Sequence, residues 1–213
     1  MSEEALAQAD ACLDRWRKTR GDRSYLFIGI GGGSASGKTT LANQTAGFLA
    51  PLRVAVIHQD RFFKTNEEKP KYFSKIHDTD RPDYNRPDSF RVEEMIDFCR
   101  KVRDTDIVIL EGILTLHFAE LRALMDVKIF VHADADERIV RRIRRNLPKS
   151  SFDEIAGYYI ESVRYRHQEF CEPTRLFADL VIEGGMADDE GRDAVVQAIC
   201  RRVRLAHAGS SLA

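Results

Sequence analysis

The sequence predicts a three-layer α/β fold, in which about five parallel strands form a sheet with helices on both faces. Short apolar segments alternate with amphipathic ones along most of the chain. The apolar segments are continuous rather than alternating with polar residues, which is typical of parallel strands buried on both faces. Ligands of such sheets bind at the carboxyl ends of the strands. The residues that follow each strand are therefore the candidates for function.

Length and charge limit the classes of protein that fit. The chain has 213 residues and a net charge of −1, with 33 Lys and Arg against 34 Asp and Glu. That length suits one domain with appendages, and the balanced charge argues against a protein that coats nucleic acid or an acidic membrane. The sequence has no run of roughly 20 apolar residues that could span a bilayer. Its acidic N-terminus is unlike a signal peptide, and its four widely spaced cysteines suit neither a disulfide framework nor a zinc site. We expect a cytoplasmic protein, with homo-oligomerisation left open.

Two regions are expected along the chain. Residues 1–21 form an N-terminal helix, because Leu6, Leu13 and Trp16 share one face at helical spacing. Residues 22–213 form the main domain. Its strands are expected at 25–30, 53–58, 106–112, 127–133 and 179–183. Its helices are expected at 40–50, 89–102, 118–125, 134–146, 153–170 and 189–206. Residues 64–88 contain three prolines and little periodicity, so this stretch is expected to be a long loop, either functional or disordered.

A phosphate-binding loop follows the first strand. The motif G-x-x-x-x-G-K-[ST] is matched at every fixed position, between a strand and a helix. Backbone N–H groups of such a loop point at phosphate oxygens, and the following helix adds its positive end. The predicted nucleotide-binding residues are Gly32, Gly33, Ser34, Ala35, Ser36, Gly37, Lys38, Thr39 and Thr40. Lys38 can reach the β- and γ-phosphates, and the Thr39 hydroxyl is suited to Mg²⁺. The sequence lacks the N-K-x-D segment of many GTPases, which favours a kinase or an ATPase.

Two acidic residues end neighbouring strands. Asp60 follows the second strand and Glu111 ends the third, so both are expected at the edge of the sheet that carries the phosphate-binding loop. Phosphoryl transfer to an alcohol needs a held Mg²⁺ and a group that accepts the hydroxyl proton. Two carboxylates at this edge can divide those tasks.

An arginine-rich segment follows the fourth strand. Arg138, Arg141, Arg142 and Arg145 recur at helical spacing, and Ile139, Val140 and Ile143 are expected on the buried side. Planar guanidinium groups suit phosphoryl oxygens. Residues of about 138–152 are therefore expected to form a lid over the phosphates.

The chain resembles the uridine kinase family, within the group that includes phosphoribulokinase, pantothenate kinase and nicotinamide riboside kinase. The resemblance extends from Tyr25 to Glu183. Its matching pieces are IGIGGGSASGKTT, HQDRFF, RPDSF, ILEGIL, KIFVHADADERIVRRIRRN and YIESVRYRHQEFCEPTRLFADLVI. The first piece is generic among nucleotide-binding proteins, whereas the last two are specific.

The resemblance implies a role for each matching position. Asp60 corresponds to the catalytic base for the 5′-hydroxyl, and Thr39 and Glu111 to groups around Mg²⁺. By its position, the carboxylate of Asp60 can also help to hold this ion. Arg142 and Arg145 correspond to lid arginines that reach the ribose and the phosphates. ATP, or GTP, with Mg²⁺ is the implied donor.

Two departures from the family concern the acceptor. Uridine kinases place a β-hairpin before the E-G strand, but the roughly 20 residues from Phe90 to Glu111 are fully used by a helix and a strand. Asn85 also stands where the family often has a ribose-binding Asp, for which Asp83 or Asp88 could substitute. An acceptor-binding insertion is expected at about 61–90, because it is rich in aromatic residues, including Phe63 and Tyr84.

These observations predict a kinase that phosphorylates a primary hydroxyl of a small molecule, with uridine or cytidine as the first choice. The residues expected to bind the acceptor are Asp60, Phe63, Tyr84, Asn85 and Arg142. Lys38 joins Asp60, Arg142 and Arg145 as an expected catalytic group. Two alternatives stay open: another acceptor (nicotinamide riboside, pantothenate, a sugar or a sugar phosphate), or a nucleotide-binding regulator without transfer activity.

Overall fold

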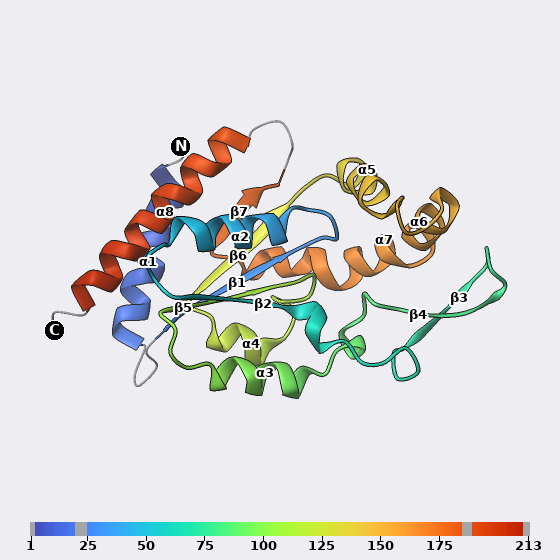
Figure 1. Ribbon diagram of the computed structural model, residues 1–213, viewed down its shortest axis with the longest axis horizontal. Coiled ribbons are helices and arrows are strands. Elements are labelled where there is room, and N and C mark those ends of the chain that lie inside the picture. Colours follow the sequence, from blue (N-terminus) through green and yellow to red (C-terminus); the bar gives the residue numbers. More distant parts are fainter. Residues whose placement is uncertain (1–2, 20–24, 185–188, 211–213) are drawn as a thin grey trace.

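A five-stranded parallel sheet forms the centre of the molecule (Figure 1). The computed structural model describes residues 3–19, 25–184 and 189–210. The strands are β1 (Leu26–Gly32), β2 (Val54–His58), β5 (Ile107–Glu111), β6 (Val127–His132) and β7 (Leu180–Glu183), in the order β2-β5-β1-β6-β7. All four pairings are parallel. The expected fold class is confirmed, and the strands end together at one edge.

Helices cover both faces of this sheet. The helices α1 (Glu3–Thr19), α2 (Lys38–Phe48) and α8 (Asp189–Ser210) pack on one face, against strand residues such as Ile28 and Ile30. The helices α3 (Val92–Lys101) and α4 (Ala119–Leu124) pack on the other face, against Phe27 and Phe130. Successive side chains of a strand point to opposite faces. The continuous apolar strands therefore supply two hydrophobic cores.

Two helices that include most of the segment expected as a lid, about 138–152, project from the carboxyl edge of the sheet and are called the lid helices below. They are α5 (Ala135–Asn146) and α6 (Phe152–Tyr158), which begins with a capping box at Ser151 and Glu154. Two π-helical turns, at Tyr159–Val163 and His167–Cys171, flank the short helix α7 (Arg164–Arg166). The expected buried side of α5 is wrong at Val140, which is 47% exposed, whereas Arg138 is buried. The cause is that α5 extends past the sheet, so little of it faces a core (Figure 1).

Residues 64–88 are more ordered than the sequence indicates. The strands β3 (Lys71–Ser74) and β4 (Thr79–Pro82) form an antiparallel hairpin within the expected loop. Glu161 ties this hairpin to the lid helices, because its carboxylate accepts hydrogen bonds from Ser74 Oγ at 2.6 Å and from the Ile76 N–H at 3.1 Å. Between Phe90 and Glu111 the structure has only α3 and β5, as expected. None of the described helices is long and apolar enough to cross a membrane.

Candidate active site

The loop after β1 forms a cradle for an anion. Its backbone takes positive φ angles at Gly32 (145°), Ala35 (64°) and Gly37 (101°). No side chain caps the amino end of α2, so the first N–H groups of this helix are left for phosphate oxygens. At Gly32 a Cβ atom would lie 2.4 Å from the Val131 carbonyl oxygen, so this residue has to be glycine. The arrangement fits the triphosphate of a nucleotide.

Lys38 is the buried cation of this loop. Its Nζ donates to the Gly33 carbonyl at 3.3 Å, and the residue is 8% exposed. Burial lowers the pKa of the ammonium group, while the charges of Glu111 and Asp60 act in the opposite direction. A cation held in this way is suited to compensate the charge of phosphates.

Glu111 connects three elements at the carboxyl edge of the sheet. Its Oε1 accepts a hydrogen bond from Thr39 Oγ1 at 3.1 Å and lies 2.7 Å from His58 Nδ1. Its Oε2 is buried and has no hydrogen-bond partner among the described residues. Proteins commonly bind Mg²⁺ through one or two carboxylates together with substrate phosphates. An unpartnered carboxylate oxygen beside the Thr39 hydroxyl fits such an ion.

Asp60 is the second residue after the end of β2, in a short 3₁₀ helix at Gln59–Phe62. Its side chain is open to the solvent of the site, but the surrounding walls bury it enough to raise the pKa of the carboxyl group. The positive charge of Lys38 opposes this rise, and the negative charge of Glu111 adds to it. The structure thus gathers Asp60, Lys38 and Glu111, as the sequence predicts.

Arg141 and Arg142 of α5 contact the phosphate-binding loop, Arg141 through the Ala35 and Ser36 carbonyls at 3.5 Å, whereas Arg145 is exposed. Arg142 donates to Ser34 Oγ at 2.8 Å and lies over the ring of Tyr158, 5.3 Å from its centroid. The positive charge of Arg145 acts on both Lys38 and Asp60. Arg144 is exposed. Arg138 has a different position from the expected one, since it is buried and donates to the Ala133 carbonyl.

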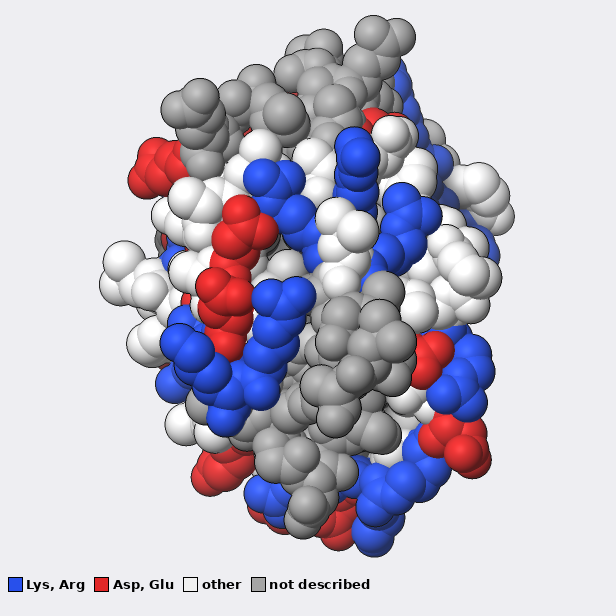
Figure 2. All heavy atoms as spheres, turned by 90° about the vertical axis from the view of Figure 1, so that its left-hand side faces the viewer, with Lys and Arg blue, Asp and Glu red and all other residues white. Residues whose placement is uncertain are grey.

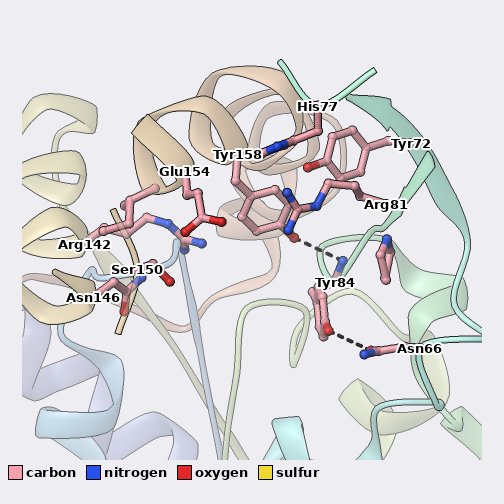
Figure 3. Close-up of a pocket in the computed structure, with 12 residues that line it drawn as sticks. Asn66, Tyr72, His77, Arg81, Tyr84, Arg142, Asn146, Ser150, Glu154 and Tyr158 are labelled. Carbon is pink, nitrogen blue, oxygen red and sulfur yellow. Dashed lines mark hydrogen bonds between the residues drawn. The ribbon is translucent and has the colours of Figure 1, made fainter. Parts of the chain in front are cut away.

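A cavity of about 300 Å³ lies between the hairpin and the lid helices (Figure 3). Tyr72, Tyr84 and Tyr158 give it aromatic walls, and the rings of Tyr72 and Tyr158 are 5.7 Å apart. The Tyr158 hydroxyl accepts a hydrogen bond from the Tyr84 N–H at 3.3 Å. The remaining lining residues are Asn66, His77, Arg81, Pro82, Arg142, Asn146, Ser150, Glu154 and Ile155.

The expected acceptor residues divide into two groups. Tyr84 and Arg142 line this cavity, whereas Asp60 is not among its lining residues. Phe63 lies behind Tyr84, stacked on Phe90 with centroids 4.4 Å apart. Asn85 is 8% exposed and donates from its side-chain amide to the Tyr158 hydroxyl at 2.8 Å. It also lines a small hollow with Ser34, next to the phosphate-binding loop.

The two acids that could substitute for Asn85 differ in their surroundings. Asp83 is fully buried, and its carboxylate accepts hydrogen bonds from Ser162, from Arg166 and from the Asn85 N–H. Asp88 is paired with Arg86 at 2.9 Å.

Sequence reasoning missed four features of this site. Tyr158, Arg81 and Glu154 line the cavity without having been singled out, and His58 contacts Glu111. One signal was available: the sequence SSFDE at 150–154 has the pattern of a capping box before a helix. That helix carries Glu154 and Tyr158 on successive turns of one face.

Comparison with known proteins identifies relatives. The family described as phosphoribulokinase / uridine kinase matches residues 63–189. A uridine kinase of Lactococcus lactis subsp. cremoris (strain MG1363) is 32% identical over 209 residues, which cover 83% of this chain and 97% of that protein. A uridine kinase of Clostridium novyi (strain NT) is 32% identical over 200 residues, covering 82% and 94%.

A solved structure agrees with these relatives on the fold. It is a protein of Silicibacter sp. TM1040 described as a fructose transport system kinase, with a TM-score of 0.60 at 19% identity, covering 82% of this chain and 98% of that one. Together with the phosphate-binding loop and the acids beside it, the sequence relatives show that the chain belongs to the phosphoribulokinase/uridine kinase family and is an ATP-dependent kinase.

Proposed function

We propose that this protein transfers the γ-phosphate of Mg²⁺-bound ATP to a primary hydroxyl of a small molecule held in the cavity between the hairpin and the lid. The 5′-hydroxyl of uridine or cytidine is the first acceptor to test. One observation carries the proposal: Arg142 lines the cavity and donates to Ser34 of the phosphate-binding loop. Arg142 thus connects the cavity to the loop.

The residues of the loop hold the donor. Backbone N–H groups from Gly32 to Thr40 bind the phosphates, and Lys38 supplies a buried positive charge. Thr39 and Glu111 hold Mg²⁺ with help from Asp60, because a hydroxyl and carboxylates are the ligands this ion prefers. The bound ion offsets negative charge on the phosphates.

Asp60 accepts the proton of the attacking hydroxyl. Burial raises the pKa of Asp60 and so makes it a stronger base than an ordinary aspartate, while the positive charge of Lys38 opposes this rise. Arg142 and Arg145 lie on the lid side, where planar guanidinium groups stabilise the transferring phosphoryl group.

The cavity walls suit a nucleoside acceptor. Aromatic side chains stack on a planar base, and three tyrosines are available here. The Asn85 amide lies against the Tyr158 hydroxyl, and Tyr158 is a wall of the cavity. The relatives at 32% identity carry the name uridine kinase, which supports the same choice.

A second acceptor class has its own support. Arg81 lines the cavity and has no ion-pair partner among the described residues, and Figure 3 shows its side chain directed toward Tyr158. With Arg142 it gives the cavity two guanidinium groups against the carboxylate of Glu154. This charge favours an acceptor with an acidic group, such as a sugar phosphate or pantothenate, over the cationic nicotinamide riboside.

An ADP-release assay over a panel of acceptors tests the proposal. The panel contains uridine, cytidine, nicotinamide riboside, pantothenate, fructose and ribulose 5-phosphate, each with ATP and Mg²⁺. We expect uridine or cytidine to stimulate ADP release most strongly. Stimulation by the acidic acceptors alone would select the second class. If no member stimulates release while Mn²⁺-bound nucleotide still binds, the proposal of transfer to these acceptors fails.

A Glu154→Gln and Arg81→Gln pair refines the result. Both side chains line the same cavity, so a neutral acceptor should respond similarly to either change. An acidic acceptor should lose kcat/KM in the Arg81 variant alone.

A further inference from the structure

His58 contacts the carboxylate that the proposed function assigns to Mg²⁺. It ends β2, directly opposite Glu111 in the register with β5. The two residues are therefore held side by side by the backbone pairing of adjacent strands. His58 Nδ1 lies 2.7 Å from Glu111 Oε1, which is the shortest of the contacts described around this carboxylate.

The two oxygens of Glu111 have different surroundings. Oε1 receives hydrogen bonds from both His58 and Thr39. Oε2 is buried and has no hydrogen-bond partner among the described residues. A buried carboxylate oxygen without a partner is unfavourable unless a ligand meets it. The contact with His58 thus fixes the plane of the carboxylate and leaves one oxygen for an ion.

We propose that His58 is a positioning residue, which holds Glu111 by its Nδ1–H so that Oε2 faces the metal ion. This inference rests on the proposed function only in taking Glu111 as a ligand of Mg²⁺. Carboxylate ligands are themselves commonly hydrogen-bonded, and loss of such a partner typically costs about 10–100-fold in metal affinity or activity. His58 does not touch the reacting atoms in this role.

A purely structural role for His58 makes a different prediction. Its side chain is half exposed, so its removal leaves little unfilled volume and should lower stability only slightly. If the residue only ended a strand, any side chain of similar size would serve equally well. If it positions Glu111, the N–H donor is what matters.

Two variants of similar size separate these readings. His58→Asn keeps an N–H donor near the position of Nδ1, whereas His58→Leu has none. The readout is the binding of Mn²⁺ to the full chain with a non-hydrolysable ATP analogue, followed by electron paramagnetic resonance without any acceptor. His132→Ala is the matched control, because His132 ends strand β6, which β1 separates from β5, and faces Asp134 rather than Glu111.

We expect the Leu variant to bind Mn²⁺ about 10–100-fold more weakly than the unaltered protein, and the Asn variant and the control to stay within about threefold. Binding of the analogue without metal should be unchanged in all of them. Equal Mn²⁺ affinity in the Leu variant, or an equal loss in Leu and Asn, would overturn the role of His58. If the Leu variant does not fold, His58→Ala takes its place in the same comparison.

The same measurement keeps this inference apart from the proposed function. Suppose that Mn²⁺ binding weakens in His58→Leu but not in His58→Asn, while no acceptor stimulates ADP release. That result would support the positioning role of His58 and refute the transfer proposal. If the unaltered protein with nucleotide binds no Mn²⁺, the assignment of Glu111 to the metal fails, and the role of His58 fails with it.

Discussion

A buried ammonium group needs negative charge in front of it, and at Lys38 Glu111 and Asp60 supply part of that charge. Among the residues that the structure describes, its Nζ makes one hydrogen bond, to the Gly33 carbonyl, which leaves two donors for phosphate oxygens. Removing the cation leaves the backbone cradle in place. The effect should therefore fall on phosphate binding and on turnover rather than on folding.

Lys38→Ala should lower kcat by about 10²–10³-fold, as expected when one stabilising donor at a reacting centre is lost. Steady-state kinetics with a saturating acceptor measures it, and thermal unfolding checks the fold. A purified, folded variant with nearly normal turnover would refute the catalytic role of this lysine.

Asp60→Asn should separate the chemical step from donor binding. The amide keeps the shape of the side chain but loses its basicity, so kcat should fall by about 10²–10⁴-fold, the usual contribution of a general base. ATP affinity should change little, because the loop supplies most of its contacts. Calorimetric titration of ATP beside the kinetics decides it. A joint loss of both would place Asp60 mainly at the metal.

The pH dependence of kcat/KM should carry the signature of Asp60. Burial raises the pKa of this carboxyl group, and the base works only when it is deprotonated. Activity should therefore fall as pH drops through the raised pKa, at a pH above the value of about 3.9 for a free Asp side chain. Rate measurements in overlapping buffers, with stability checked at each pH, test this. If kcat/KM of Asp60→Asn still falls at low pH as in the unaltered protein, the titration of another group causes that decrease.

Among the elements, α5 shows most clearly how a helix can carry different roles on different sides. Arg138 is buried, Arg142 contacts the phosphate-binding loop, and Arg144 is exposed. The positive charge of Arg145 acts on Lys38 and Asp60. The helix therefore gives a test in which neighbouring arginines serve as controls for one another.

Arg142→Lys and Arg145→Lys should each lower kcat by at least about tenfold, because a point charge does not replace the planar fork of a guanidinium group. Arg144→Ala should be nearly silent. Parallel kinetics on the three variants measure this. Similar losses at all three positions would instead indicate a diffuse positive field.

The hairpin β3–β4 shows where sequence reasoning ends. The strands of the sheet were predictable, because short continuous apolar segments are typical of strands that are buried on both faces. The phosphate-binding loop was predictable from the motif between Gly32 and Thr39. The hairpin has short strands with mixed polarity, so no pattern of period two marks it. Its position depends on Glu161, about 85 residues away in the sequence. Contacts between residues so far apart in the sequence produce no pattern in the local sequence.

The same limit explains the outcome at the candidate site. Asp60 and Glu111 could be placed together because strand ends of a parallel sheet meet at one edge. Phe63 and Asn85 could not be placed, because an aromatic residue lines a cavity or packs behind it depending on its neighbours. Here the ring of Phe63 stacks on Phe90, and the side-chain amide of Asn85 donates a hydrogen bond to the Tyr158 hydroxyl. The expected burial of Val140 was wrong for a similar reason, because helix α5 extends past the sheet and away from the core (Figure 1).

At the scale of the whole molecule, the N-terminal helix belongs to the main core. Ala9, Leu13 and Trp16 of α1 are buried with residues of the sheet and of α8. The face that α1 and α8 form shows Lys and Arg interspersed with Asp and Glu (Figure 2). Ion pairs on this side include Arg202 with Asp10 at 2.9 Å and Arg17 with Asp14 at 3.2 Å.

Trp16→Ala should lower the free energy of unfolding by about 3–5 kcal/mol, the usual cost of truncating a large buried aromatic residue. The side chain is 1% exposed, so its removal leaves a cavity between α1 and the sheet. Urea denaturation measures the change, and Glu4→Ala on the exposed side of the same helix should stay within about 0.5 kcal/mol. An equally small effect at Trp16 would mean that α1 contributes little to the core.

Under the proposed function, the single guanidinium group of Arg142 couples the binding of the donor to the binding of the acceptor. It donates to Ser34 on the donor side and lies over Tyr158 on the acceptor side. A ligand that moves this group on one side changes the free energy of the other side. Linkage then requires reciprocity: whatever factor the donor imposes on the affinity for the acceptor, the acceptor imposes on the affinity for the donor. Binding of the two substrates should accordingly be cooperative, with a sign set by which contact of Arg142 is lost first.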